Sequence, residues 1–281
     1  MKNFKIETAT FAEMDFIINC AREEGWNPGL YDKEAFYAAD PGGFFIAKLD
    51  NKPVGCISAV KYEGNFGFVG LFIVLPEYRN HGYGSKLQEQ MLQYLKGCNI
   101  GRDAVPTNQE RGKRQGAKYF YANKRYEGTA SIKAPKDSAI TELSKVAFDD
   151  LLKYDTRIFG IERKKFLEKW INQPKSFSYA YLDEKKNIKG YGLLRKCFKG
   201  YKIGPLFAGN SQIADIIYRH LLQNISGENF YFDIPMINQG AVNMVRKYNL
   251  EAVFETARMY IGSPLQSNVD QVFGVTTFEL G

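Results

Sequence analysis

A single strand-to-helix corner constrains the fold of this chain more than any other feature. The run "FGFVGLFIV" (66–74) is apolar at successive positions, which predicts a central strand that is covered on both faces. The stretch "PEYRNHGYGSKLQEQML" follows at once and places Arg79, Gly82 and Gly84 in one turn. Beyond the turn, apolar residues recur at helical spacing and predict an amphipathic helix.

Two interpretations of this turn are open on the residues alone. Glycine supplies the backbone conformations that a tight corner needs. A glycine turn at a helix N-terminus also exposes unpaired N–H groups beside the positive end of the helix dipole, which suits an anion. Arg79 can add a charge-assisted hydrogen bond and Ser85 a hydroxyl group. The spacing R-x-x-G-x-G between a buried strand and an amphipathic helix therefore favours a phosphate site.

Composition narrows the class of protein. The 281 residues carry a net charge of +7, and between Pro76 and Ala130 ten Lys or Arg stand against five Asp or Glu. The basic excess therefore lies around and after the turn, where it forms either an ordinary solvated face or part of a site for an anionic ligand. No apolar run of about 18 residues predicts a membrane span, and the start lacks a signal peptide. Four scattered cysteines and two histidines give no zinc-site spacing, so we expect no metal and a cytoplasmic location.

Two successions of strands and helices indicate an α/β (α+β) architecture. The first half predicts a hairpin over "GGFFIAKLD" and "VGCISAVKY", the central strand, a short strand ending at Asp103 and the β-rich "AKYFYANKRY". The second half predicts helices over "ITELSKVAFDDLLKYD" and "ERKKFLEKW", followed by strands near 176–183, 190–198 and 201–208. A helix from Ser211, the strand ending at "YFD", a helix from Gln239 and the strand "ARMYIG" close the chain.

A local match supports an internal duplication. In "DAVPTNQ" and "DIPMINQ", Asp103 and Asp233 each follow a predicted strand, and Asn-Gln comes five residues later. Between the two halves, "GTASIKAPKDSA" is rich in small and polar residues and predicts a linker. We therefore predict a first domain over 1–130, a linker over 131–138 and a second domain over 139–281.

The motif "LFIVLPEYRNHGYGSKL" resembles the acyl-CoA-binding motif of the GNAT N-acetyltransferase superfamily, Arg/Gln-x-x-Gly-x-Gly/Ala. The stretches "GWNPGLYDKEAFYAADPGGFFIA" and "GRDAVPTNQERGKRQGAKYFYANKRYEG" resemble a tandem bacterial subgroup of that superfamily. Its second half is a degenerate acetyltransferase-like domain, which "FGIERKKFLEKW", "KIGPLFA" and "FDIP" resemble. The resemblance implies two tandem GNAT-like domains, each with a mixed, mostly antiparallel twisted sheet flanked by helices.

The resemblance also implies acetyl-CoA as co-substrate. Phe72, Ile73 and Val74 would pair through their backbone with the pantetheine arm where two central strands diverge. Asn108 would contact a pantetheine amide, unless it caps the helix after Pro106. The pyrophosphate would be held by the turn residues Arg79, Asn80, His81, Gly82, Tyr83, Gly84 and Ser85.

The catalytic groups are less clear from the sequence. Relatives carry a tyrosine that protonates the leaving thiolate, and Gly112 stands at that position, so Tyr119 or Tyr121 is the nearest substitute acid. A thiol with a pKa near ~8.5 is already a fair leaving group, so no acid is required. Asp103 is the leading candidate for general base, with helix capping as its alternative role. The weaker candidates for the base are Glu23, Asp32 and Asp40.

The second half offers no R-x-x-G-x-G after its third strand, so we expect one CoA per chain. Arg195, Asp233 and Arg258 are polar residues in otherwise apolar strands, and would either line a pocket facing the first domain or pair with one another. Trp26 would line the acceptor site or belong to the core.

These features predict a GNAT-type N-acetyltransferase. The first domain would transfer an acetyl group to a small-molecule amine by direct attack in a ternary complex, and the second would shape the acceptor pocket. The alternative is a CoA-responsive binding module without turnover, because Gly112 replaces the tyrosine. Neither nucleic acid nor membrane is expected as a partner, and a homodimer is left open.

Overall fold

The computed structural model describes residues 3–281, and its first half follows the expected order of elements. The hairpin, the central strand and the helix after the turn are confirmed. The strands are β1 (Phe4–Thr8), β2 (Phe44–Leu49), β3 (Lys52–Lys61), β4 (Phe66–Val74), β5 (Asn99–Ala104) and β6 (Lys118–Thr129). The helices are α1 (Met14–Glu23), α2 (Asp32–Ala39), α3 (Tyr83–Tyr94) and α4 (Pro106–Arg114), with a 3-10 turn at Pro76–Tyr78.

The second half also alternates strands and helices. Its strands are β7 (Ile140–Glu142), β8 (Phe177–Leu182), β9 (Ile188–Lys196), β10 (Tyr201–Ala208), β11 (Asn229–Pro235), β12 (Glu251–Ile261) and β13 (Val272–Gly274). Its helices are α5 (Phe148–Phe159), α6 (Lys164–Trp170), α7 (Ser211–Leu222) and α8 (Gln239–Lys247). Short 3-10 turns lie at Leu143–Lys145, Gln223–Ile225 and Val269–Gln271.

One predicted helix is wrong at its start. The sequence predicts a helix from Ile140, but residues Ile140–Glu142 form the edge strand β7, which pairs antiparallel with β8. The helix α5 begins only at Phe148. An available strand edge satisfies the backbone of β7, so long-range pairing overrides the local helical pattern here.

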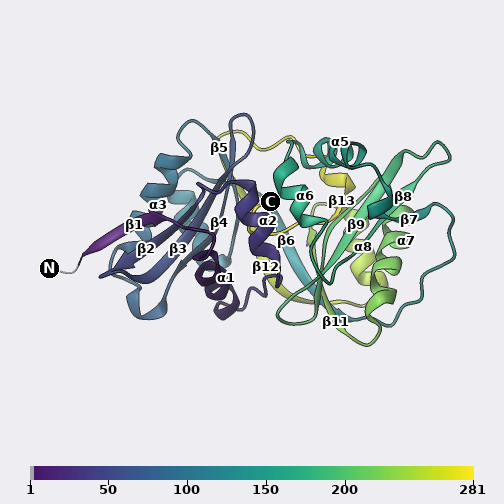
Figure 1. Ribbon diagram of the computed structural model, residues 1–281, viewed down its shortest axis with the longest axis horizontal. Coiled ribbons are helices and arrows are strands. Elements are labelled where there is room, and N and C mark those ends of the chain that lie inside the picture. The colour runs from purple at the N-terminus through teal and green to yellow at the C-terminus, as the bar shows by residue number, and fades with distance from the viewer. Residues whose placement is uncertain (1–2) are drawn as a thin grey trace.

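A single mixed sheet runs through both halves (Figure 1). Its strand order is β1-β2-β3-β4-β5-β12-β6-β11-β10-β9-β8-β7, and β13 pairs with β10. The pairs β4–β5 and β10–β11 are parallel, and the remaining pairs are antiparallel. The chain therefore has the predicted α/β fold, in which each half is a mostly antiparallel sheet flanked by helices.

The two halves exchange a strand. β12 of the second half pairs with β5 of the first, and β6 of the first half pairs with β11 of the second. In Figure 1, β6 and β12 lie between the two halves, and the C-terminus lies near the middle of the molecule. Residues 131–137 connect the halves without a helix or strand. The predicted domains, 1–130 and 139–281, therefore share one sheet, because each contributes one strand that lies between two strands of the other.

The repeated aspartates lie at the exchanged strands. Asp103 on β5 binds Arg258 on β12, and Asp233 on β11 binds Arg125 on β6, each in bidentate fashion. Each aspartate is thus paired with an arginine that reaches it from the other half. The match between "DAVPTNQ" and "DIPMINQ" reflects two equivalent positions in a duplicated fold.

The strands β4 and β5 diverge in the middle of the first half. They are paired only as far as Val69 and Arg102. Just beyond, Leu71 has a positive φ of 48° and the register with β3 shifts, which is the signature of a β-bulge. Backbone groups of β4 from Gly70 onward therefore have no strand partner on the β5 side.

Apolar packing fixes the elements around this gap. α3 buries Leu87 and Met91 against the sheet, as its periodicity predicts. α2 packs against α6 across the halves, where the Phe36 and Trp170 rings stack 6.0 Å apart. Within residues 3–281, no helix combines the length and apolarity that a membrane crossing requires.

Candidate active site

The glycine turn has the conformation that an anion site requires. Gly82 has a φ of 81° and Asn80 a φ of 64°, so both occupy the left-handed region before α3 begins. None of the described residues accepts a hydrogen bond from the N–H groups of residues 80–84. These donors face outward at the positive end of α3, which makes the turn a ready site for phosphate.

Gly84 serves a different purpose from Gly82. It is helical, but a Cβ atom there would lie 3.1 Å from Nη1 of Arg111 and 3.2 Å from the Phe72 ring. Glycine therefore lets α3 approach β4 closely, while Gly82 supplies the positive φ.

A groove of about 650 Å³ lies beneath the turn. It brings together most of the residues that the sequence suggests for CoA, namely Phe72, Ile73, Val74, Arg79, Asn80, Gly82, Gly84, Ser85 and Asn108. Two suggested residues do not line it. The His81 ring nitrogen Nδ1 lies 2.7 Å from the Arg79 carbonyl oxygen, and the Tyr83 ring stacks on Phe4 at 4.8 Å.

Arginine side chains make the groove basic. Arg79 donates from Nε to the Val74 carbonyl oxygen at 2.9 Å and forms an ion pair with Glu24. Arg111 also lines the groove, with its guanidinium 5.4 Å from the centre of the Phe72 ring. Sequence reasoning missed Arg111, although the basic excess after the turn was the available signal.

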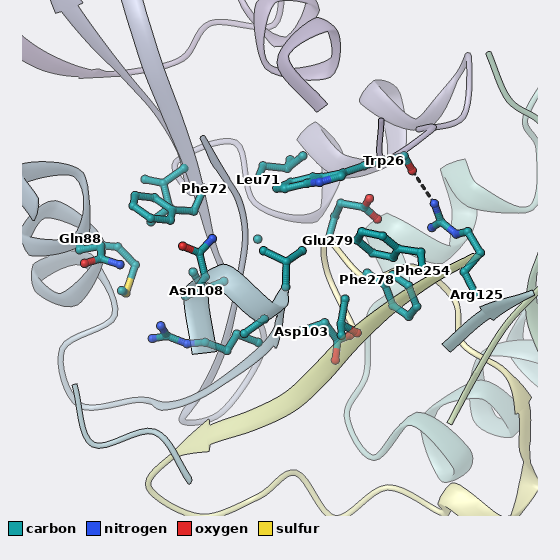
Figure 2. Close-up of a pocket in the computed structure, with 18 residues that line it drawn as sticks. Trp26, Leu71, Phe72, Gln88, Asp103, Asn108, Arg125, Phe254, Phe278 and Glu279 are labelled. Atoms are coloured by element: carbon teal, nitrogen blue, oxygen red, sulfur yellow. Dashed lines mark hydrogen bonds between the residues drawn. The ribbon is translucent and has the colours of Figure 1, made fainter. Parts of the chain in front are cut away.

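A second, smaller cavity of about 70 Å³ continues from the groove through the gap between β4 and β5. Figure 2 shows its two ends: Phe72, Gln88 and Asn108 lie on one side, and the aromatic rings of Trp26, Phe254 and Phe278 on the other. The residues shared by groove and cavity are Trp26, Phe72, Val105, Asn108 and Phe254.

Asp103 lines the cavity, but its carboxylate is fully engaged. Oδ1 accepts from Asn123 at 2.8 Å and from Nε of Arg258 at 2.7 Å, and Oδ2 accepts from Nη2 of Arg258 at 2.7 Å. Burial raises the pKa of Asp103, and the Arg258 guanidinium opposes that rise. The alternative capping role is wrong for both Asp103 and Asn108, because Val105 is the N-cap of α4 and no side chain caps it.

Glu279 is a second cavity carboxylate, which sequence reasoning missed. It is 5% exposed, lines the cavity, and accepts from the Thr277 hydroxyl at Oε2. Among residues 3–281 no group donates to its Oε1. The C-terminal segment reaches β4 because Gly70 has no side chain: a Cβ there would lie 2.2 Å from the Glu279 carbonyl oxygen. No local pattern in the sequence signals such a long-range approach.

The suggested catalytic tyrosine lies elsewhere. Tyr119 is 59% exposed on β6 and lines neither the groove nor the cavity. Tyr121 is buried, and burial raises its pKa. At Gly112, a Cβ would meet Sδ of Met259 at 3.5 Å and Nη1 of Arg102 at 3.7 Å. Arg102 and Met259 thus occupy the space toward which a side chain at position 112 would point.

The suggested acceptor residues of the second half behave differently from expectation. Arg195 pairs with Asp32 at 3.0 Å, while Asp233 and Arg258 pair with Arg125 and Asp103. They therefore pair with residues of the first half, not with one another, and none of the three lines the groove or the cavity. Trp26 does line both, and its carbonyl oxygen accepts from Arg125 at 2.7 Å.

The three weaker base candidates lie outside the cavity lining. Asp32 binds Arg195 and accepts from the Gly29 N–H at 2.7 Å. Asp40 accepts from the Tyr94 hydroxyl at 2.9 Å. Glu23 is exposed at the end of α1.

The second half has no equivalent of the glycine turn. Its helix α7 follows β10, as α3 follows β4, but the Asn210 side chain accepts from the Ile213 N–H at 2.9 Å and caps the helix. The donor that a phosphate would use is already satisfied there.

Both halves match one family of enzymes. Residues 11–123 match the acetyltransferase (GNAT) family, and residues 151–274 match the acetyltransferase (GNAT) domain. The chain belongs to the GNAT acetyltransferases. It carries two GNAT domains in tandem, and it is an acyltransferase enzyme.

Several similar proteins match this GNAT chain over nearly its whole length. A holothin acyltransferase from Pseudoalteromonas sp. (strain SANK 73390) is 26% identical over 274 residues, covering 97% of this chain and 93% of the relative. A candidate acetyltransferase from Pyrococcus horikoshii has a TM-score of 0.85 at 22% identity, covering 99% of this chain and 96% of its own. A tandem GNAT protein from the clavulanic acid biosynthesis pathway has a TM-score of 0.66 at 9% identity, with coverages of 93% and 100%.

Proposed function

We propose that this enzyme transfers an acetyl group from acetyl-CoA to the amine of a small molecule, by direct attack within a ternary complex. The observation that carries this proposal is the continuity between the groove and the cavity. The groove lies under a turn whose N–H groups suit a pyrophosphate, and it meets the cavity beside the point where β4 and β5 diverge.

The first half would hold the donor. A pantetheine arm lying in the gap would run along the edge of β4 at Phe72, Ile73 and Val74, which β5 leaves uncovered, with Asn108 close by. The turn residues and Arg111 would hold the phosphates. Residues 1–130 are thus the proposed CoA-binding domain.

The second half would complete the acceptor site. Phe254, Phe278 and Glu279 come from residues 139–281 and meet Trp26 of the first half across the cavity. Three aromatic rings around one carboxylate suit an amine attached to an apolar body. The relative named for acyl transfer to holothin supports a small-molecule acceptor.

The chemistry needs one proton acceptor. A bond forms between the amine nitrogen and the acyl carbon, the bond between that carbon and sulfur breaks, and the amine loses a proton. Glu279 lines the cavity and none of the described residues donates to its Oε1, whereas both oxygens of Asp103 are held by neighbours. Glu279 is therefore the better-placed base, directly or through a water molecule. The leaving thiolate needs no dedicated acid, since its pKa lies near ~8.5.

A second candidate function is a CoA-responsive binding module without turnover. It is favoured by one observation, the glycine at position 112 where the relatives' tyrosine would stand. Release of free CoA from acetyl-CoA on incubation with amines, polyamines and amino acids separates the two. Amine-dependent release supports the transferase, and tight acetyl-CoA binding without release for any amine favours the binding module.

A cytoplasmic location and a homodimer remain predictions.

A further inference from the structure

Arg102 is a buried cation without a counterion among residues 3–281. It lies on β5, is 7% exposed, and donates from Nη1 to Oε1 of Gln115 at 2.9 Å. Its Nε and Nη2 are buried and have no hydrogen-bond partner among the described residues. Burial lowers the pKa of its guanidinium to about 10. A buried charge is ordinarily paired, because its desolvation is costly.

The other buried arginines of this chain show what is missing. Arg125, Arg163, Arg195 and Arg258 each pair with an aspartate at 2.7–3.0 Å. Arg102 has no acid within ion-pair distance among residues 3–281.

The unpaired edge of Arg102 has a defined chemistry. In Arg125 and Arg258, Nε and Nη2 together bind the two oxygens of one carboxylate, at 2.7–2.8 Å. The same two nitrogens are the free ones in Arg102. A guanidinium edge of this kind matches a carboxylate in bidentate geometry.

The surroundings of Arg102 are those of a binding site. It lines the cavity together with Gln88 and Asn108, whose side-chain amides have no hydrogen-bond partner among the described residues. Ile57 and Met91 form apolar walls beside them. Figure 2 shows Gln88 and Asn108 on the side of the cavity away from Phe254 and Phe278.

We propose that Arg102, assisted by Gln88, is a subsite for a carboxylate carried by one of the two reactants. The inference rests on the proposed transferase function. It adds recognition of a carboxylate, which transfer of an acetyl group does not by itself require. Ile100 of β5 packs in the same cluster as Leu87 and Met91 of α3. Alternate residues of a strand share a face, so Arg102 lies on the side of α3 and away from Asp103. A short acyl group that ends in a carboxylate would enter this side from the thioester. The carboxylate of an amino-acid acceptor is the other source.

Binding measurements test the donor arm. Calorimetry would compare succinyl-CoA with butyryl-CoA, which has the same chain length without the charge, and with acetyl-CoA. We expect the parent to bind succinyl-CoA about tenfold or more tightly than butyryl-CoA, and Arg102→Met to abolish that preference while leaving acetyl-CoA affinity unchanged. Gln88→Leu should reduce the preference partly. Arg114→Met, at an exposed position in the same basic stretch of the sequence, is the matched control.

Turnover tests the acceptor arm. With acetyl-CoA as donor, the rates for an amino acid and for its decarboxylated amine would be compared in the parent and in Arg102→Met. If Arg102→Met loses turnover only with the amino acid, the subsite is supported and binds the carboxylate of the acceptor. If the variant instead loses only its binding of succinyl-CoA, the subsite binds the carboxylate of the donor. The donor arm needs no turnover, so it reads out even if the transferase proposal fails.

Two results would overturn the subsite. Equal losses for charged and uncharged members of both pairs would show that Arg102 serves the common part of the reactants. No preference for either carboxylate in the parent would show that the guanidinium binds none. Urea unfolding serves as the control for correct folding. The free energy of unfolding of Arg102→Met should be close to that of the parent, because the substitution removes an unpaired buried charge.

Discussion

Replacing Asp103 with asparagine distinguishes a structural role from a catalytic one at the centre of the molecule. The carboxylate is fully buried and accepts three hydrogen bonds, two of them from Arg258 of the exchanged strand β12. Asparagine removes the charge and leaves the Arg258 guanidinium buried without a counterion. Losing one partner of a buried ion pair costs about 3–5 kcal/mol. We therefore expect the free energy of unfolding to fall by that amount.

A second substitution checks the origin of this loss. In the double variant Asp103→Asn with Arg258→Met, no unpaired charge remains, and methionine can fill the space between the Phe68 and Tyr121 rings, which flank the guanidinium at 5.0 and 5.7 Å. Apolar replacement of a whole buried pair is often neutral. The double variant should therefore be clearly more stable than Asp103→Asn alone.

Urea unfolding followed by tryptophan fluorescence measures both variants, since Trp26 lies at the cavity and Trp170 in the core. The rate of CoA release per folded molecule, measured across pH, is the catalytic readout. If Asp103 is structural, the folded fraction should keep its rate and its pH profile. A loss of under about 1 kcal/mol together with a rate that recovers at high pH would refute this reasoning and identify Asp103 as the base.

The remaining predictions concern the ligands. Gly82→Glu should abolish acetyl-CoA binding in calorimetry, because a negatively charged side chain would occupy the phosphate position and would strain a backbone whose φ is 81°. Unchanged affinity in a folded variant would show that this turn does not bind CoA. Titration should give one CoA per chain, because Asn210 already caps α7, and two equivalent sites would contradict this. Glu279→Gln should lower amine turnover by about 10²-fold or more at neutral pH without changing acetyl-CoA affinity, and the rate should partly recover at higher pH as free amine becomes available. Glu255→Gln, which changes an exposed glutamate on β12, is the control. An unchanged rate in Glu279→Gln would exclude Glu279 as the base.

Local sequence patterns determined much of the donor side. The apolar run 66–74, the glycines at 82 and 84, and the helical spacing after them specify strand, turn and helix through short-range backbone and burial preferences. Because these elements are adjacent in the sequence, nine of the eleven residues that it suggested for CoA do line the groove. Arg111 was missed, since a basic residue on a helix is usually a solvated one.

The repeat was also visible, but its meaning was not. Asp103 and Asp233 occupy equivalent positions, yet nothing local shows that each binds an arginine 155 or 108 residues away in the chain. Asn108 and Asn238 also occupy equivalent positions, but their side chains have different roles, which the sequence does not show. Asn238 caps α8 by accepting from the Ala241 N–H at 3.1 Å, whereas Asn108 lines the cavity.

Only the tertiary structure decided the acceptor side. The pairing of β12 with β5 brings Phe254 to the cavity, and the C-terminal segment brings Glu279 against Gly70. Strand register and the packing of a terminal segment depend on contacts between residues far apart in the sequence, so no local pattern encodes them. Whether a buried polar residue is paired depends on those same contacts. The sequence could therefore identify Arg195, Asp233 and Arg258 as unusual, but only the fold showed that these are paired and that Arg102 is not.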